Sequence, residues 1–518
     1  MKISFLSRSR GAQLAGLAAV VVFLGLIARF WHPLFGFTAF YQLDAPNDEL
    51  KIGAFRELPV YVHRDTGGYD GLYYAQIAHD PTLRSPELPR AMDNFSYRAR
   101  RILPPALAWL LGAGQPAWII HTYSLINVIA WLVLAALLWR LFRVADGRSW
   151  LLWAGVLFSA GAVSSVRLAL TDLTALTLIA AAMLAQENGY GRSGTALLAA
   201  SGLGRETALL AFAGRLTRPW FSARNVMLAL IVAAPLAAWL GYVRWRLGPA
   251  DAGWANLSIP GSGLMGKWRE VVTALSTVND APLVWTTLLA TVGLTVQLGF
   301  IALRPRLDDG WWRIGAAYAV LLLFLGTAVW EGHPGAATRV LLPLQLAFNV
   351  LVHRTRAAFL WLILGNLSVL AGFVAIRDVP QDRNELTAQR LDGLVAVARF
   401  EDGWFNREQD KKHRWLWSRQ EATVTIETLP HAVADVTMTF GLRSVTPRTV
   451  SVSQASRELW RGEIGPALTA HRVVVSMPAG RGKLTFTSDT PPVRENAGAN
   501  ARELAFALYD VRLELPQP

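Results

Sequence analysis

Long apolar runs recur over most of the chain, and they constrain its fold more than any other feature. A bilayer core about 30 Å thick needs roughly 20 apolar residues in a helix that rises about 1.5 Å per residue. Because lipid offers no hydrogen-bond partners to the backbone, such runs are expected to be helical. The runs lie at residues 11–30, 116–142, 149–165, 169–186, 195–213, 225–245, 282–303, 312–330, 337–353 and 357–376. We therefore predict a polytopic α-helical membrane protein with about 9–11 membrane helices.

The charge content of the chain agrees with this prediction. Only 17% of its residues are charged, whereas soluble domains carry about a quarter. The net charge of +13 is high, and we interpret it first as an arginine bias of cytoplasmic loops and second as attraction for anionic lipid or phosphate. No basic stripe with interleaved aromatic residues lies outside the apolar runs, so we expect no nucleic-acid partner. The chain has no cysteine, which excludes disulfides and cysteine metal sites.

Arginines in the connections predict how the helices are oriented. The positive-inside rule places arginine-rich loops in the cytoplasm. These loops are residues 140–148, 304–313 and 354–356. The first apolar run follows basic residues and lacks a small-residue cleavage site, so we expect an uncleaved helix with a cytoplasmic N-terminus. Run 195–213 has arginines at both ends, which predicts a re-entrant hairpin or a broken helix. The expected outer segments are then residues 31–102, 246–281, 331–336 and everything after about 377.

The tail of the chain changes its periodicity to two. Segments such as ATVTIETL and VADVTMTF alternate apolar with polar residues, and Pro and Gly turns separate them. This pattern predicts an antiparallel β-sandwich. We therefore expect a membrane domain over residues 1–380 and a β-sandwich domain outside the cytoplasm over residues 395–518. Four tryptophans of the tail suit either a carbohydrate-binding face or the sandwich core, namely Trp404, Trp415, Trp417 and Trp460.

The first outer loop, residues 31–102, is the main candidate for a functional site, because long loops in compact proteins are usually functional. It contains Asp65-Thr-Gly-Gly-Tyr69-Asp70-Gly-Leu-Tyr73-Tyr74 and, further on, Tyr97-Arg98-Ala-Arg100-Arg101. Aromatic rings pack against sugars, a carboxylate accepts a hydroxyl proton, and guanidinium groups match phosphate. The loop thus suits a site for a sugar and a phosphate. The alternative is an interfacial helix capped by Asp70, with the arginines facing lipid headgroups.

Charged residues in or beside later apolar runs are further candidates. Ionisable groups inside a membrane are costly and mark functional sites by default. The candidates are Arg167 with Asp172, Arg205 with Glu206, and the outer turn that holds Glu331, His333 and Arg339. Each group has a structural alternative. The first would be an ion pair or a cap, the second an anchor near the cytoplasmic face, and the third ordinary loop polarity.

Three segments, GYDGLYYAQIAHDP, YRARRILPP and SGLGRETALL, resemble bacterial membrane glycosyltransferases of the GT-C superfamily. The likeness is closest to mannosyltransferase-like proteins of cell-surface glycopolymer formation, and it covers most of residues 1–376. The spacing Asp70-x-x-x-Tyr74 is similar to the W-D-x-x-x-Y element of the mannosyltransferase in glycosylphosphatidylinositol synthesis, with Tyr69 in place of the tryptophan. The superfamily pattern of an acidic residue in the first outer loop is met by Asp65 and by Asp70. The Tyr-Asp-Gly context favours Asp70.

The resemblance implies a GT-C-like enzyme that transfers a hexosyl or pentosyl unit from a polyprenyl-phosphate-linked donor. The acceptor would be a cell-surface glycan or lipid-linked acceptor outside the cytoplasm. Asp70 would act as general base, with Asp65 as the alternative, and arginines would neutralise the departing phosphate. The expected substrate-binding residues are Tyr69, Tyr74, Arg98, Arg101, Arg167, Asp172, Arg205, Glu206, Glu331, His333 and Arg339. The residue usage suits a bacterium, which would place the protein in the inner membrane with its outer face in the periplasm.

Other functions and a metal stay open as alternatives. No spacing of His and Asp demands a metal, so we expect none, while a divalent cation is kept as an alternative. A transporter or flippase for a lipid-linked glycan would have paired inverted repeats, which the sequence lacks. A non-catalytic glycan assembly protein would tolerate Asp70→Asn, which an enzyme would not. A ligase that transfers whole glycans would differ only in the size of its donor.

Overall fold

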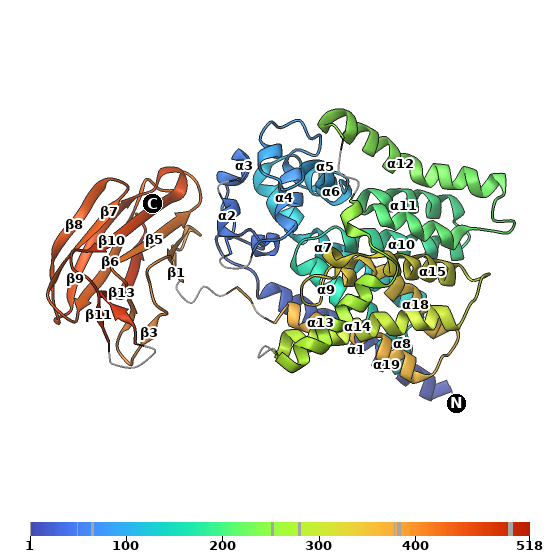
Figure 1. Cartoon of the computed structure of the whole chain (residues 1–518). Helices are drawn as coiled ribbons and strands as arrows, with labels where there is room; N and C mark the ends of the chain where they lie inside the picture. Colours follow the sequence, from blue (N-terminus) through green and yellow to red (C-terminus); the bar gives the residue numbers. More distant parts are fainter. Residues whose placement is uncertain are drawn as a thin grey trace. The chain divides into compact units, whose positions relative to one another are not determined.

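The computed structural model describes residues 2–48, 50–63, 67–249, 253–277, 281–377, 379–380, 385–495 and 501–517. The chain forms two compact units. One comprises Met1–Trp31, Phe37–Ile52 and Val62–Val379, and the other comprises His32–Gly36, Gly53–Tyr61 and Pro380–Pro518. Figure 1 shows that the first unit is built of helices and that the strands belong to the second.

Helices occupy every apolar run of the first unit. The longer helices are α1 (Lys2–Ala28), α7 (Pro116–Phe142), α8 (Gly147–Leu157), α10 (Asp172–Glu187), α11 (Gly191–Gly204), α12 (Ala223–Leu247), α13 (Ser262–Thr277), α14 (Ala281–Leu303), α15 (Gly310–Phe324) and α18 (Leu342–Arg354). The shorter ones are η1 (Thr38–Tyr41), α2 (Ala45–Asp48), α4 (Gly71–His79), η2 (Leu88–Arg90), α5 (Phe95–Arg98), α6 (Leu103–Leu111), α9 (Ala160–Arg167), η3 (Glu206–Arg215), η4 (Trp254–Asn256), α16 (Thr327–Trp330), α17 (Ala337–Val340), α19 (Phe359–Gly365) and α20 (Ser368–Ala375).

Four helices in the described part of the chain are long and apolar enough to cross a membrane. They are Arg10–Ala28 within α1, α7, α12 and Pro282–Leu303 within α14. Helices α8 and α9 form a fifth candidate span if the pair, which bends by 45°, counts as one. In α1 and α12 only 17% of the most apolar window is buried, so most of their apolar surface is uncovered by protein. These helices are compatible with a membrane protein, and the higher number of membrane helices expected from the sequence stays a prediction.

The run at residues 195–213 is a broken helix. Helix α11 ends at Gly204, Arg205 adopts an extended conformation with φ −158° and ψ 130°, and the chain continues as η3. The two pieces fold back on each other, because a Cβ atom built on Gly194 at the start of α11 would lie 2.7 Å from Nη1 of Arg215 at the end of η3. Both ends of this hairpin therefore lie together.

The strands of the second unit form two antiparallel sheets with one shared core. The larger sheet has the order β1-β2-β5-β10-β7-β8 and the smaller one the order β3-β4-β13-β6-β9, with β11-β12 as a separate pair. The bounds are β1 (Glu385–Gln389), β2 (Val395–Phe400), β3 (Glu408–Gln409), β4 (Arg414–Trp417), β5 (Glu421–Thr428), β6 (Asp435–Ser444), β7 (Arg448–Gln454), β8 (Arg457–Ile464), β9 (Thr469–Ser476), β10 (Arg481–Ser488), β11 (Val493–Arg494), β12 (Glu503–Leu504) and β13 (Phe506–Glu514). The predicted C-terminal antiparallel sheet domain is confirmed, and β1 begins ten residues before the expected start at residue 395.

Alternation decides which side chains enter this core. In β6 the buried positions are every second residue, from Val436 to Ser444, as expected for a strand with one face inward. Trp404 packs against Phe400, Phe486 and Phe506 with ring centroids 5.7–5.9 Å apart. For Trp404 the structure therefore favours packing in the core over a carbohydrate-binding face.

Candidate functional site

A cavity of about 770 Å³ lies at one end of the helical unit, where α10 begins and α11 breaks. Its walls come from the first long loop, η3, the segment around η4, and the stretch from α15 to α17. Several residues predicted from the sequence line this cavity, namely Tyr69, Asp70, Arg98, Arg101, Arg205, Glu206, Glu331 and Arg339. The volume falls within the roughly 300–1,000 Å³ that is usual for small-molecule sites.

Asp70 directs its carboxylate to the cavity instead of capping a helix. It directly precedes α4, yet its side chain makes no capping hydrogen bond. Its Oδ2 atom forms an ion pair with Nη1 of Arg98 at 2.8 Å, and the side chain is 27% exposed. The backbone around Asp70 is fixed by a close approach, because a Cβ on Gly71 would lie 2.3 Å from the carbonyl oxygen of Leu168. Glycine after Asp70 is thus a packing requirement of the site.

Arg98 binds two carboxylates and an aromatic ring. It donates to Asp93 through Nε at 3.0 Å and Nη2 at 2.7 Å, and it lies 5.0 Å from the ring centroid of Tyr73. Burial by itself would lower the pKa of Arg98, but the hydrogen bonds with Asp93 and the charge of Asp70 raise that pKa above its ordinary value. Burial would likewise raise the pKa of Asp93, and the bond from Arg98 lowers it overall. Arg98 is therefore a permanent cation that organises the carboxylates of this loop.

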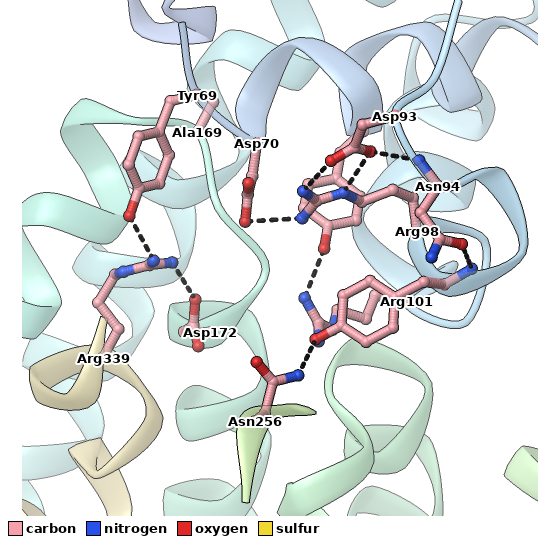
Figure 2. A network of polar contacts seen from close by, with 12 residues as sticks. Tyr69, Asp70, Asp93, Asn94, Arg98, Arg101, Ala169, Asp172, Asn256 and Arg339 are labelled. Atoms are coloured by element: carbon pink, nitrogen blue, oxygen red, sulfur yellow. Dashed lines mark hydrogen bonds and ion pairs between the residues drawn. The ribbon is translucent and has the colours of Figure 1, made fainter. Parts of the chain in front are cut away.

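Arg101 connects the loop to the broken helix. It is only 6% exposed, and its Nε atom lies 3.1 Å from Oε2 of Glu206. Its other nitrogens donate to the hydroxyl groups of Tyr74 at 2.7 Å and Tyr97 at 2.9 Å. The amide of Asn256 donates to the same Tyr97 hydroxyl at 3.4 Å. The first long loop, η3 and the segment around η4 thus meet around Arg101 and Tyr97. Figure 2 shows Arg101 and Asn256 of this network.

Asp172 holds two arginines at the wall of the cavity. It begins α10 and is 4% exposed. One carboxylate oxygen pairs with Arg205, and the other lies 3.3 Å from Nη1 of Arg339. Figure 2 shows Arg339 between Asp172 and Tyr69, to whose hydroxyl it donates at 2.7 Å. The buried carboxylate of Asp172 therefore orients Arg339, and Arg339 in turn orients the side chain of Tyr69, which precedes Asp70 in the sequence.

The observed pairs differ from those that sequence proximity indicates. Arg205 pairs with Asp172, while its neighbour Glu206 pairs with Arg101. The extended backbone at Arg205 explains the difference, because successive side chains of extended chain point in opposite directions. Arg167 donates to the carbonyl of Ala39 at 3.1 Å instead of joining this ion-pair network.

Several predicted site residues lie elsewhere. Arg167 also lies 5.0 Å from the ring centroid of Phe30, so it supports the start of the loop and does not line the cavity. His333 is hydrogen-bonded to Thr287 of α14 at 2.8 Å and is also absent from the lining. Tyr74 and Asp172 are not among the lining residues, but they contact the lining residues Arg101 and Arg339, respectively. Asp65 lies outside the described residues.

The structure adds residues that the sequence prediction did not include. These are Asp93, Asn94, Tyr97, Arg100 and Asn256. A signal existed for the first two, since an Asp-Asn pair before a short helical stretch is a typical N-cap, and Asn94 accepts from the backbone N–H of Tyr97 at 3.1 Å. Asn256 carries no local signal, because it reaches the site only through the fold.

Arginine side chains pair with the described carboxylates of the site. Among the described residues, no three His, Asp or Glu side chains gather in a way that could hold an ion. Arg98 sits between Asp70 and Asp93, and Arg339 and Arg205 occupy both oxygens of Asp172. The expectation of no metal, with a divalent cation as the alternative, stays a prediction.

The lining of the cavity combines two kinds of side chain. One set is the charged and aromatic residues described above. The other set is apolar and includes Leu257, Leu321, Leu325, Ala328, Val329 and Val340. A cavity with this lining suits an amphiphilic ligand that has a polar, anionic part and a hydrocarbon part.

Comparison with known proteins leaves the family open. No model of a protein family matches the chain, and no curated protein sequence matches it either.

Proposed function

We propose that the protein is an integral-membrane glycosyltransferase. It moves a sugar from a polyprenyl-phosphate-linked donor to a cell-surface glycan or a lipid-linked acceptor. The observation that carries this proposal is the mixed lining of the cavity, in which Asp70 and arginines occur together with aliphatic side chains. A polyprenyl-phosphate sugar has the matching parts in one molecule, namely a sugar, a phosphate and a hydrocarbon chain.

In the proposed reaction the acceptor hydroxyl oxygen attacks the anomeric carbon of the donor. The bond between that carbon and the phosphate oxygen breaks, and polyprenyl phosphate leaves with the bonding electrons. Asp70 takes the hydroxyl proton as general base. Arginines of the cavity lining offset the charge that develops on the phosphate oxygen, and Arg205 and Arg339 are held ready for this by Asp172.

The distribution of arginines supports a periplasmic position for the cavity. Helix α10 runs from Asp172 at the cavity to Glu187, and the chain from Arg339 through α18 ends at Arg354. Arg354 pairs with Glu187, so these two helices end together, away from the cavity. The loops of that end carry arginines at positions 140, 143, 148, 192, 215, 218, 224, 304, 306, 313, 354 and 356. By the positive-inside rule this end is cytoplasmic. Arg244 and Arg246 depart from this pattern, because Arg246 donates to the carbonyl of Arg84 in the first long loop.

The uncovered helices support insertion in a membrane. Apolar side chains of α1 and α12 are exposed along their length, among them Leu14, Val21, Leu230 and Ile231. Exposed apolar surface of this extent on long helices is typical of contact with lipid. We place the protein in a bacterial inner membrane, with the sheet domain in the periplasm.

The test is transfer of radiolabelled sugar from polyprenyl-phosphate donors to a membrane glycan fraction. Asp70→Asn should lower the rate by about 10²–10⁴-fold at matched expression and folding, as expected for loss of a general base. Asp308→Asn is the matched control, because Asp308 is 85% exposed at the opposite end of the helical unit. Equal transfer by Asp70→Asn would remove this residue from the mechanism and point to Asp65. No transfer by the native protein with several donors would favour the transporter or assembly functions.

A further inference from the structure

A second pocket, of about 210 Å³, lies in the sheet domain between the two sheets. We call it the arginine pocket. Its apolar residues come from β1, β2, β4 and β13, and its charged residues come from β4, β13 and the loop before β3. The apolar set is Leu386, Phe400, Leu416 and Val511, and the charged set is Arg407, Arg414, Asp510 and Arg512.

A β-bulge shapes the edge of this pocket. The pairing of β13 with β6 shifts register between Tyr509 and Arg512. Asp510 within the bulge has a φ of +45°, in the left-handed region that few residues other than glycine adopt. Bulges re-aim side chains and are common beside binding sites. Both carboxylate oxygens of Asp510 have a partner that stabilises this conformation. One lies 2.5 Å from Nδ1 of His413, and the other accepts from the backbone N–H of Arg414 at 3.0 Å.

Among the described residues that line the pocket, arginines outnumber carboxylates by three to one. Arg407 donates to the backbone carbonyl of Glu385 at 3.0 Å. Among the described residues, neither Arg414 nor Arg512 forms a salt bridge, and both are exposed. Among the described residues of the lining, Asp510 is the sole carboxylate, and it is bonded to His413. The nearby Arg502, by contrast, pairs with two glutamates at 2.6 and 2.8 Å.

We propose that the arginine pocket binds an acidic sugar residue of a glycan. The pocket is smaller than sites for drug-sized ligands, which measure roughly 300–1,000 Å³, so it takes a single ring. The aliphatic residues and Phe400 offer a surface for the C–H face of a sugar. The guanidinium groups at the rim match a carboxylate or phosphate on that sugar. This binding is independent of the transfer reaction proposed for the helical unit.

The test measures binding of trigalacturonic acid to the full-length protein in phosphatidylcholine nanodiscs by calorimetry at fixed ionic strength. The fully methyl-esterified trisaccharide serves as the neutral probe. The double variant Arg414→Gln/Arg512→Gln should bind the acidic probe roughly tenfold to hundredfold more weakly than the native protein. Arg457→Gln on β8 is the matched control, because it is exposed and does not line the pocket. It should leave the affinity unchanged.

Four results would overturn the proposal. The first is equal affinity of native protein and double variant for the acidic trisaccharide, and the second is equal affinity of native protein for the neutral probe. The third is the absence of binding at probe concentrations up to about 10 mM. The fourth is binding of inorganic phosphate as tightly as the acidic trisaccharide, which would leave an anion site without a sugar site.

Discussion

Replacement of Asp172 by asparagine should destabilise the helical unit more than any single change at its surface. Asp172 is 4% exposed and Arg339 is 7% exposed, and Arg205 shares the same carboxylate. Removal of one partner from a buried ion pair costs about 3–5 kcal/mol, because the remaining charge stays buried without compensation. Here two cations lose one shared partner and then face each other. We therefore expect a loss of about 4–5 kcal/mol in the free energy of unfolding.

The assay is unfolding in mixed micelles by SDS titration, followed by tryptophan fluorescence. The variants are Asp172→Asn, Arg205→Gln, the double variant and Asp308→Asn. The loss in the double variant should be smaller than the sum of the two single losses by at least about 2 kcal/mol. The reason is that the double variant removes Arg205, which would otherwise stay buried without its partner. Asp308→Asn breaks an exposed pair with Arg218 and should cost less than about 1 kcal/mol. A loss below about 1 kcal/mol for Asp172→Asn, or losses that add within about 0.5 kcal/mol, would refute the reasoning.

Two further predictions concern the loop that carries Asp70. Gly71→Ala should cost about 1–3 kcal/mol and reduce sugar transfer, because the added Cβ would lie 2.3 Å from the carbonyl oxygen of Leu168 and displace α4. Gly147→Ala, where a Cβ meets nothing within 4 Å, is the control, and an equal response of both variants would contradict the packing argument. Burial lowers the pKa of His63 from 6.5 to about 4, so the folded protein binds this proton less readily than the unfolded chain. Native stability should fall by about 2 kcal/mol more than that of His63→Gln between pH 7.5 and 5, and parallel pH curves would exclude this role.

The helices and strands could be read from the sequence because their signals are local. An apolar run of about 20 residues predicts a helix wherever it lies in the fold, and the structure has helix in each run. The alternation in segments such as Glu421–Thr428 and Asp435–Ser444 likewise predicts strands, which are observed as β5 and β6. The order of those strands was not predictable, since β5 pairs with β2 and β10 through contacts distant in sequence.

The types of residue in the candidate site could be predicted from the sequence, but the contacts between them could not. Acidic residues and arginines beside aromatic residues in a long loop marked Asp70, Arg98 and Arg101, and all three line the cavity. Asn256 could not be identified in this way, because nothing in its local sequence differs from an ordinary loop.

Local sequence by itself determined which segments are helices or strands and which polar residues are costly to bury. Only the tertiary structure decided which charges meet. Arg205 and Glu206 are adjacent in the chain, yet they pair with Asp172 and Arg101, which lie 33 and 105 positions away. The physical reason is that a buried charge takes the partner that the packed helices bring within ion-pair distance. Arg205 and Glu206 are neighbours in the chain, but the extended backbone at the break turns their side chains to different partners.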